Sequence, residues 1–142
     1  MSEPPVLALH GNIGAASDWE PRGIESLRAV SLWEHADLSF FEMAHALATT
    51  LSEGMDRPIL AGYSLGGRLA LHAMAIHPDR WSGAVIASAH PGLVTAEERA
   101  ARRSHDANWA RVARELSWAE FLEKWNAQAV FDGRRSTPEQ LA

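Results

Sequence analysis

The chain has 142 residues, 46% of them hydrophobic, and a formal net charge of −5 at pH 7. This length and composition are typical of one globular domain with a sizeable core, and the acidic balance argues against a general nucleic-acid or anionic-membrane surface. Because there is no cysteine, disulfides, thiol catalysis and thiolate metal sites are excluded. The apolar run near the N-terminus is too short for a signal peptide or a membrane span, so we expect a cytoplasmic protein.

Short apolar runs alternate with helical patterns in the first part of the chain. Four of these runs have the continuous apolar character of buried strands: residues 5–9, 27–32, 58–63 and 83–89. Between them, residues 39–51 begin with the capping-box pair Ser39 and Glu42, and residues 65–76 end before Pro78. Strands separated by helices predict an α/β fold, with a parallel sheet and helices on both of its faces.

The character of the chain changes after residue 93. From Thr95 onward there are helical patterns and no strand pattern, and Thr95 with Glu98 repeats the capping-box spacing. Four apolar residues then share one helical face: Trp118, Phe121, Leu122 and Trp125. We therefore predict two parts, the N-terminal part of an α/β core at residues 1–93 and a helical region at residues 94–142, such as a cap over a pocket.

Two features suggest that the chain is a shortened copy of a longer protein. Thr137 and Pro138 form a helix-start signal with almost no chain after it. The strand predicted at residues 83–89 is uniformly apolar, yet it would lie at an uncovered edge of the sheet. We therefore expect the C-terminal strands of the core to be missing.

Residues 62–66 match the G-x-S-x-G pattern of a nucleophile elbow, with a strand pattern before it and a helix pattern after it. In an elbow, Ser64 would occupy strained backbone that projects its hydroxyl upward, and the flanking glycines would let strand and helix pass closely. The N–H of Leu65, at the start of the helix, would face a developing oxyanion. The alternative is a glycine-rich structural corner, but the flanking elements favour Ser64 as a nucleophile.

His10, Gly11 and Asn12 follow the first predicted strand. A His-Gly pair at this place commonly gives a second oxyanion donor, the N–H of the residue after glycine, which here is Asn12. Both motifs would then lie at the carboxyl edge of the sheet, where open α/β sheets bind ligands. We expect His10 to brace the loop rather than to act in catalysis.

The order of these motifs resembles that of an α/β-hydrolase domain. Four longer stretches carry a more specific resemblance: LHGNIGAASDW, GYSLGGRLAL, HPGLVTAEERAARRSHDANWA and FLEKWNAQAVF. They are similar to the 2-succinyl-6-hydroxy-2,4-cyclohexadiene-1-carboxylate synthases of menaquinone biosynthesis, over about the first two-thirds of that family. The resemblance implies an enzyme that eliminates pyruvate from a polycarboxylate cyclohexene substrate with a serine, a histidine and an aspartate, without a cofactor.

The resemblance also implies roles for particular residues. Ser64 is similar to the triad serine, and Asn12 and Leu65 are similar to the residues whose N–H groups form the oxyanion hole. The residues that would line the substrate pocket are Tyr63, Arg68, Arg102 and Trp125. The arginines suit a substrate with several carboxylates, because a guanidinium group binds a carboxylate through two parallel hydrogen bonds.

Structural roles compete with these functional ones. Glu98 and Arg102 are four residues apart, so a surface ion pair would explain Arg102 without a ligand. Arg68 could contact a neighbouring loop instead of the pocket. Trp125 could belong to a hydrophobic core with the other aromatic residues of its helix face.

The aspartate and histidine of the family's triad lie beyond residue 142, and none of the 7 histidines of this chain matches the base. Without a base, a serine hydroxyl is a poor nucleophile, so we expect this chain alone to be nearly inactive. The histidine spacing shows no metal motif. We predict no metal and no cofactor, and as a partner only a small-molecule carboxylate or ester.

One stretch departs from the superfamily pattern. The Pro-Gly-His-Gly turn that often follows the second strand is replaced by LWEHADLS, residues 32–39, in a loop that borders the pocket. Three enzyme classes therefore stay open: a pyruvate-eliminating lyase, an esterase and a C–C hydrolase. A further alternative is a catalytically inactive module that binds carboxylates under the arginine-rich helix.

Overall fold

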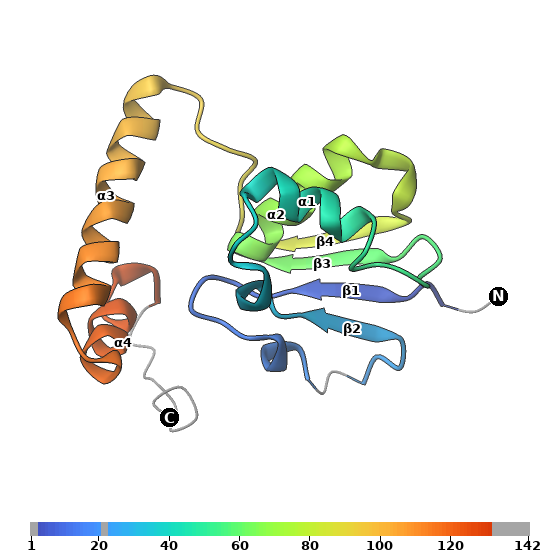
Figure 1. The fold of residues 1–142 in the computed structure, drawn as a ribbon, viewed down its shortest axis with the longest axis horizontal. Coiled ribbons are helices and arrows are strands. Elements are labelled where there is room, and N and C mark those ends of the chain that lie inside the picture. The colour runs from blue at the N-terminus through green and yellow to red at the C-terminus, as the bar shows by residue number, and fades with distance from the viewer. Residues whose placement is uncertain (1–2, 21–22, 132–142) are drawn as a thin grey trace. The chain divides into compact units, whose positions relative to one another are not determined.

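The computed structural model describes residues 3–20 and 23–131 and contains two compact units, Met1–Gly92 and Leu93–Ala142. We call them the N-terminal unit and the C-terminal unit. Figure 1 shows a sheet with helices in the former and helices alone in the latter. No helix within the described ranges is both long and apolar enough to cross a membrane.

A four-stranded parallel sheet forms the centre of the N-terminal unit. Its strands are β1 (Val6–Leu9), β2 (Leu27–Val30), β3 (Ile59–Tyr63) and β4 (Gly83–Ala87), in the order β2-β1-β3-β4 (Figure 1). Leu9 pairs with Val30 on one side and with Gly62 on the other, so these strands end at the same level. The four predicted strands are confirmed, and β4 lies at the edge of the described sheet, as expected.

Two of the strands end earlier than predicted. β2 ends at Val30, because Leu32 already belongs to a 3-10 helix, η2 (Leu32–His35). β4 ends at Ala87, because Ser88 has a φ of 51°, which extended backbone does not allow.

Two α-helices connect the strands: α1 (Phe40–Ala48) leads to β3 and α2 (Leu65–Ile76) leads to β4. α2 has the predicted bounds. α1 begins as predicted, because the Ser39 hydroxyl accepts the N–H of Glu42 and the Glu42 carboxylate accepts the N–H of Ser39. Its predicted end at Leu51 is wrong, since residues 49–54 form turns. Two short 3-10 helices lie in other connections: η1 (Ala16–Trp19) and η3 (Pro78–Arg80).

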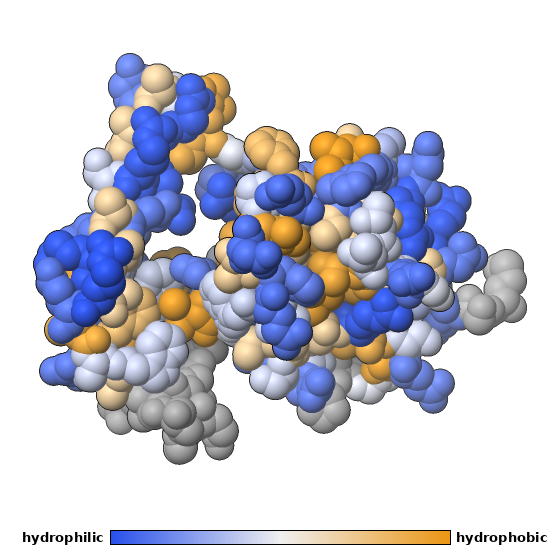
Figure 2. All heavy atoms as spheres, in the orientation of Figure 1, coloured by the Kyte–Doolittle hydropathy of each residue, from blue (hydrophilic) through white to orange (hydrophobic). Residues whose placement is uncertain are grey.

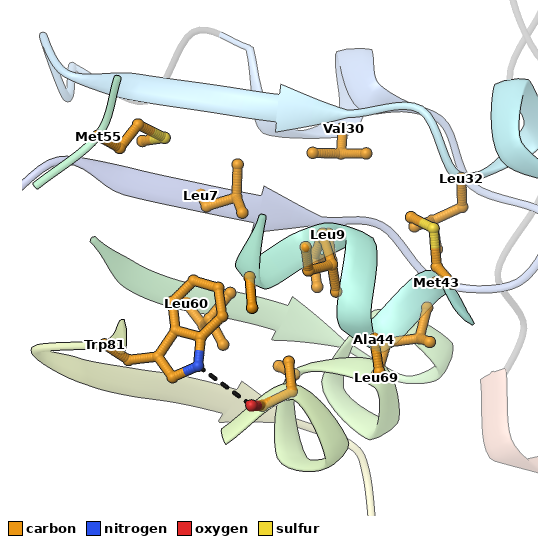
Figure 3. Close-up of a cluster of buried hydrophobic side chains, with 14 residues drawn as sticks. Leu7, Leu9, Val30, Leu32, Met43, Ala44, Met55, Leu60, Leu69 and Trp81 are labelled. Carbon is orange, nitrogen blue, oxygen red and sulfur yellow. Dashed lines mark hydrogen bonds between the residues drawn. The ribbon is translucent and has the colours of Figure 1, made fainter. Parts of the chain in front are cut away.

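The core of the N-terminal unit lies between the sheet and the helices α1 and α2. Leu7 and Leu9 are alternate residues of β1, so they point to the same face of the sheet, and both are fully buried. They form one apolar cluster with buried helix residues that include Met43, Ala44, Leu47 and Leu69 (Figure 3). At the border of this cluster the Trp81 indole donates a hydrogen bond to the Ala73 carbonyl oxygen, at 3.2 Å (Figure 3).

The opposite face of the sheet has less cover. Right-handed connections between parallel strands put the β1–β2 segment, which contains η1, on the face opposite α1 and α2. The strand register places Ala8, Ala61 and Val85 on this face. Ala8 is fully buried there, whereas Val85 of the edge strand β4 is 61% exposed.

The C-terminal unit contains α3 (Ala96–Glu115), α4 (Trp118–Asn126) and a 3-10 helix, η4 (Ala129–Phe131), and no strand among its described residues. Its helical character is as predicted. Residues 96–108 of α3 are all exposed, and Figure 2 shows much of this helix in the hydrophilic colour. The helix start predicted at Thr137 lies outside the described residues.

Capping boxes start both α-helices of this unit. Thr95 and Glu98 form the predicted box at α3, and Ser117 and Glu120 form another at α4. The backbone N–H of Thr95 holds the pKa of the Glu98 carboxyl below its usual value. The Ser117 hydroxyl does the same for the pKa of Glu120. The glutamate side chain of each capping box is therefore ionised at neutral pH.

Candidate active site

Ser64 lies on a strained turn between β3, which ends at Tyr63, and α2, which begins at Leu65. Its φ is 52° and its ψ is −113°, a combination that residues with a side chain rarely adopt. Its N–H donates to the carbonyl oxygen of Ala87 in β4, at 2.9 Å, and its hydroxyl makes no capping bond to α2. The sharp strand-to-helix turn that the motif predicts is therefore present, with the half-buried residue Ser64 at its apex.

The glycines of the motif allow the close passage that this turn needs. A Cβ atom on Gly62 would lie 2.6 Å from the carbonyl oxygen of Gly66, and a Cβ atom on Gly66 would overlap the carbonyl oxygen of Leu9. The N–H of Gly66 also donates to the carbonyl oxygen of His10, at 3.1 Å. The first turn of α2 therefore lies directly against the end of β1.

The loop after β1 reaches the same place. A Cβ atom on Gly11 would lie 2.8 Å from Cδ1 of Tyr63 and 3.3 Å from Cβ of Ser64, so this backbone touches the turn. Asn12 follows Gly11, and Leu65 is the first residue of α2, where an N–H group has no partner inside the helix. The structure thus brings Gly11, Tyr63 and Ser64 together at the carboxyl ends of β1 and β3, with Asn12 and Leu65 as the next residues of their segments.

His10 braces the loop after β1, as we expected from the sequence. It is 1% exposed, and its Nε2 accepts the backbone N–H of Leu32, at 2.9 Å. Since Nε2 accepts a proton there, the proton of the neutral ring lies on Nδ1, which donates to the carbonyl oxygen of Gly11, at 2.8 Å. Both ring nitrogens are therefore occupied by backbone groups, and neither is available as a base.

Four of the other histidines of the N-terminal unit have side-chain contacts elsewhere. His45 Nδ1 lies 2.8 Å from His77 Nε2, and the ring of His72 packs edge-on against that of Phe40, at 4.7 Å between centroids. His90 Nδ1 lies 3.1 Å from the carbonyl oxygen of Gly92. None of these contacts involves Ser64. Among residues 3–20 and 23–131 there is also no group of three or more side chains that could hold a metal ion.

Arg68 lies on the first turns of α2, and its guanidinium carbon is 5.7 Å from the ring centroid of Phe40 in α1. Such a cation–π contact is a structural role, so the alternative of a contact with a neighbouring element has direct support. The side chain is only half-buried, which leaves part of the guanidinium group open to a ligand.

Arg102 and Trp125 belong to the C-terminal unit. The competing structural reading, a surface ion pair, has direct support, but with another partner than Glu98: Glu98 caps α3, and Arg102 Nε donates to the Asp106 carboxylate at 2.7 Å. This pair is exposed, so it contributes little to stability.

The ring of Trp125 packs in an aromatic cluster. Its centroid is 4.8 Å from that of Trp109 and 5.8 Å from that of Phe121, and Phe121 is 4% exposed. Trp125 therefore has the core role that the sequence left open, within its own unit.

A functional candidate that the motifs did not indicate is Trp33. Its indole N–H donates to the carbonyl oxygen of Gly14, at 2.7 Å, and its ring lies 5.3 Å from that of His10. The only signal in the sequence is the unusual stretch LWEHADLS, which contains it.

Comparison with known proteins agrees with this architecture, although no family model matches the chain. Among solved structures, the carboxylesterase CesB (YbfK) from Bacillus subtilis aligns with 99% of this chain and 52% of its own, with a TM-score of 0.61 and 19% identity. A marine microorganism esterase aligns with 84% of this chain and 50% of its own, with a TM-score of 0.58 and 22% identity. The strand order, the sharp turn at Ser64 and these neighbours show that the chain has the α/β-hydrolase fold.

The sequence relatives are more specific. The 2-succinyl-6-hydroxy-2,4-cyclohexadiene-1-carboxylate synthase of Pectobacterium atrosepticum is 37% identical over 145 residues, which cover 91% of this chain and 56% of the relative. The synthase of Serratia proteamaculans is 35% identical over 142 residues, with 90% and 55% covered. The resemblance indicated by the motifs is confirmed, and the chain spans about half the length of the curated relatives that it matches.

Proposed function

We propose that this chain is part of a 2-succinyl-6-hydroxy-2,4-cyclohexadiene-1-carboxylate synthase, in which Ser64 is the triad serine. The observation that carries the proposal is the strained φ of 52° at Ser64, beside the loop that contains Asn12, in a chain 37% identical to such a synthase. The resemblance implies a base-initiated elimination of pyruvate from a substrate with several carboxylates, and we propose the cytoplasm as the place of this reaction.

The N–H groups of Asn12 and Leu65 are the proposed oxyanion hole. A base-initiated elimination moves negative charge onto a substrate oxygen, and backbone N–H groups that are already in place stabilise that charge without rearrangement. One such donor is typically worth about 3 kcal/mol of transition-state stabilisation. Leu65 contributes a further advantage, because its N–H lies at the positive end of the α2 dipole.

The proposed substrate-binding residues are Tyr63, Arg68, Arg102 and Trp125. Arg102 would exchange the Asp106 carboxylate for one of the substrate, which is inexpensive because the present ion pair is exposed on both sides. Trp125 would bind the substrate with a ring that its aromatic cluster holds in place. Tyr63 would bind it with a ring that lies against Gly11.

The catalytic histidine and aspartate are proposed to come from the part of the relatives' length that this chain does not span. The support is that the histidines with recorded contacts in the N-terminal unit contact groups other than Ser64. Loss of the triad histidine costs about 10⁶ in turnover in a well-studied serine enzyme. We therefore expect the 142-residue chain by itself to be almost inactive.

Two measurements on the full-length enzyme test this function. Pyruvate release, read with lactate dehydrogenase, should follow substrate consumption, and an organophosphorus probe should label Ser64. Ser64→Ala should abolish both, whereas Ser17→Ala should abolish neither, because Ser17 is an exposed serine of η1 and is not among the proposed site residues. Unchanged labelling of the Ser64→Ala variant would remove Ser64 from the mechanism.

An esterase is the second candidate, because both solved neighbours described above are esterases. It would hydrolyse a p-nitrophenyl ester with Ser64 and release no pyruvate from the synthase substrate. A carboxylate-binding module would show saturable, salt-sensitive binding of succinate to the 142-residue chain, with no turnover by the full-length protein.

A further inference from the structure

The loop that carries Asn12 is a tight, strained turn. The N–H of Gly14 donates to the carbonyl oxygen of Gly11, at 3.1 Å, and Ile13 has a φ of 60°. A residue with a branched side chain adopts such a φ only where its surroundings hold it there. The loop therefore needs external contacts to keep its shape.

Those contacts come from the segment that follows β2. At the start of the loop, the buried ring of His10 joins the N–H of Leu32 to the carbonyl oxygen of Gly11. At its end, the Trp33 indole N–H donates to the carbonyl oxygen of Gly14, at 2.7 Å. Two successive residues of one segment thus secure both ends of the Gly11–Gly14 loop.

Trp33 also completes the packing around His10. The two rings are 5.3 Å apart between centroids and inclined at 46°, so the indole covers the imidazole that holds Gly11. A single side chain therefore acts on both anchors, directly at Gly14 and through His10 at Gly11. No contact of Trp33 with Ser64 is recorded in the described part of the chain.

We propose that Trp33 is a positioning residue, which holds the Gly11–Gly14 loop against the turn at Ser64 and so fixes the place of the N–H of Asn12. The stretch LWEHADLS, which replaces the superfamily's Pro-Gly-His-Gly turn, thereby supports the site with an indole. The use of the Asn12 N–H as an oxyanion donor rests on the proposed function, but the positioning itself does not.

The first test is NMR of the ¹⁵N-labelled 142-residue protein and its Trp33→Phe variant, which keeps a ring against His10 but lacks the N–H donor. In the parent, the backbone order parameter of Asn12 should be about 0.85, and in the variant it should fall below about 0.6. Exchange of the Gly14 amide should become about tenfold faster, while α1 amides keep their rates. Trp118→Phe is the matched control, because Trp118 is 49% exposed and Trp33 is 46% exposed.

Three results would overturn the positioning role: an unchanged Asn12 order parameter, equal acceleration of the α1 amides, or the same loop mobility in Trp118→Phe.

A second test uses the full-length enzyme. Trp33→Phe should lower the rate of Ser64 labelling at saturating probe about tenfold, with an unchanged half-saturating concentration. If the loop becomes mobile in Trp33→Phe but Ser64 is labelled at the same rate, Trp33 does not act on the site at Ser64. Failure of the parent to be labelled would refute the proposed function, while the NMR result would still decide the role of Trp33.

Discussion

Gly66 lies where the first turn of α2 crosses the end of β1. A methyl group there would overlap the carbonyl oxygen of Leu9 and lie 2.6 Å from that of His10, and neither backbone group can move without disturbing the sheet. We expect Gly66→Ala to destabilise the N-terminal unit by at least about 1–3 kcal/mol, the usual range for overpacking. Urea unfolding followed by circular dichroism measures this.

Gly83, in β4, is the matched control for that substitution. A Cβ atom on Gly83 would meet no other atom within 4 Å. Gly83→Ala should therefore leave the free energy of unfolding unchanged or raise it by less than about 1 kcal/mol. Equal losses in both variants would show that the close passage at Gly66 is not the cause.

The residues of the candidate site differ in how far the sequence predicts them. Ser64 and Asn12 belong to short local motifs, so the strained turn and its neighbouring loop could be predicted directly. Trp33 could not, because its contact depends on Gly14, which is 19 positions away and has no pattern of its own. Within the alternative of a surface ion pair for Arg102, the partner is Asp106 and not Glu98, because Glu98 caps α3.

The stability of the N-terminus of α3 depends on pH, because the capping side chain of Glu98 titrates. The backbone N–H of Thr95 lowers the pKa of Glu98 from 4.5, its value in an unstructured chain. Its stabilising effect is therefore complete above that value and is lost as the pH falls through the lower pKa of the folded state. Glu98→Gln keeps a capping side chain that does not titrate, so the protection factors of the first α3 amides (intrinsic over observed exchange rate) should fall between about pH 7 and pH 3 in the parent but not in this variant.

Glu97→Gln is the control for that titration, since Glu97 is in the same first turn but outside the capping box. Hydrogen exchange of the Thr95 and Glu98 amides, followed by NMR at each pH, should show the parent's acid sensitivity in this variant. Acid sensitivity that persists in Glu98→Gln would contradict the assigned cause.

The end of α1 depends on Arg80, from the η3 segment. Its guanidinium group donates to the carbonyl oxygens of Ala48, Ser52 and Met55, at 3.1, 2.8 and 2.9 Å. Hydrogen bonds to a charged group contribute about 1.5–3 kcal/mol, so we expect Arg80→Met to lower the free energy of unfolding by about 2 kcal/mol or more. Thermal and urea unfolding measure the loss.

Arg57→Met is the control for that loss, because Arg57 is exposed and has one recorded bond, to the carbonyl oxygen of Trp81 at 3.2 Å. Its cost should stay within about 0.5 kcal/mol, as for most surface substitutions. If both variants lose the same stability, the carbonyl contacts of Arg80 do not explain the end of α1.

Arg80 also explains why the starts of elements were easier to predict than their ends. Ser39 with Glu42 fixes the start of α1 within four residues of chain. Its end at Ala48 depends on Arg80, which is 32 residues away. The end of β2 also depends on a distant residue, because the N–H of Leu32 donates to the ring of His10, 22 residues earlier, and not to a neighbouring strand. The local periodicity of the sequence does not reveal contacts with such distant residues, so these two ends could not be predicted.

For the molecule as a whole, the apolar edge strand β4 is open to association with another chain. In the sheet that the structure describes, β4 pairs only with β3, and Val85 is 61% exposed. An apolar edge strand is a template for pairing with another chain. We expect the 142-residue protein to self-associate as its concentration rises, and Val85→Lys to reduce the weight-average mass in sedimentation without a loss of stability.

Val94→Lys is the control for association, because Val94 is 88% exposed but belongs to no strand. It should leave the sedimentation profile unchanged. A parent chain that stays monomeric at high concentration, or an equal effect of both lysines, would contradict association through the edge of β4.

Replacing Ser64 by glycine should stabilise the fold while removing the proposed triad serine. A side chain at a φ of 52° and a ψ of −113° costs on the order of 1–3 kcal/mol, and glycine adopts this conformation without that cost. We expect Ser64→Gly to raise the free energy of unfolding by up to about 1 kcal/mol in urea, and a loss of stability would contradict this.

Natural selection for thermal robustness alone would therefore remove this serine. Random libraries screened for survival at high temperature should return glycine at position 64, in variants that the organophosphorus probe does not label. A copy of the gene released from selection for chemistry would drift the same way. Under the proposed function, a serine kept in this strained turn reflects selection for reactivity and not for stability.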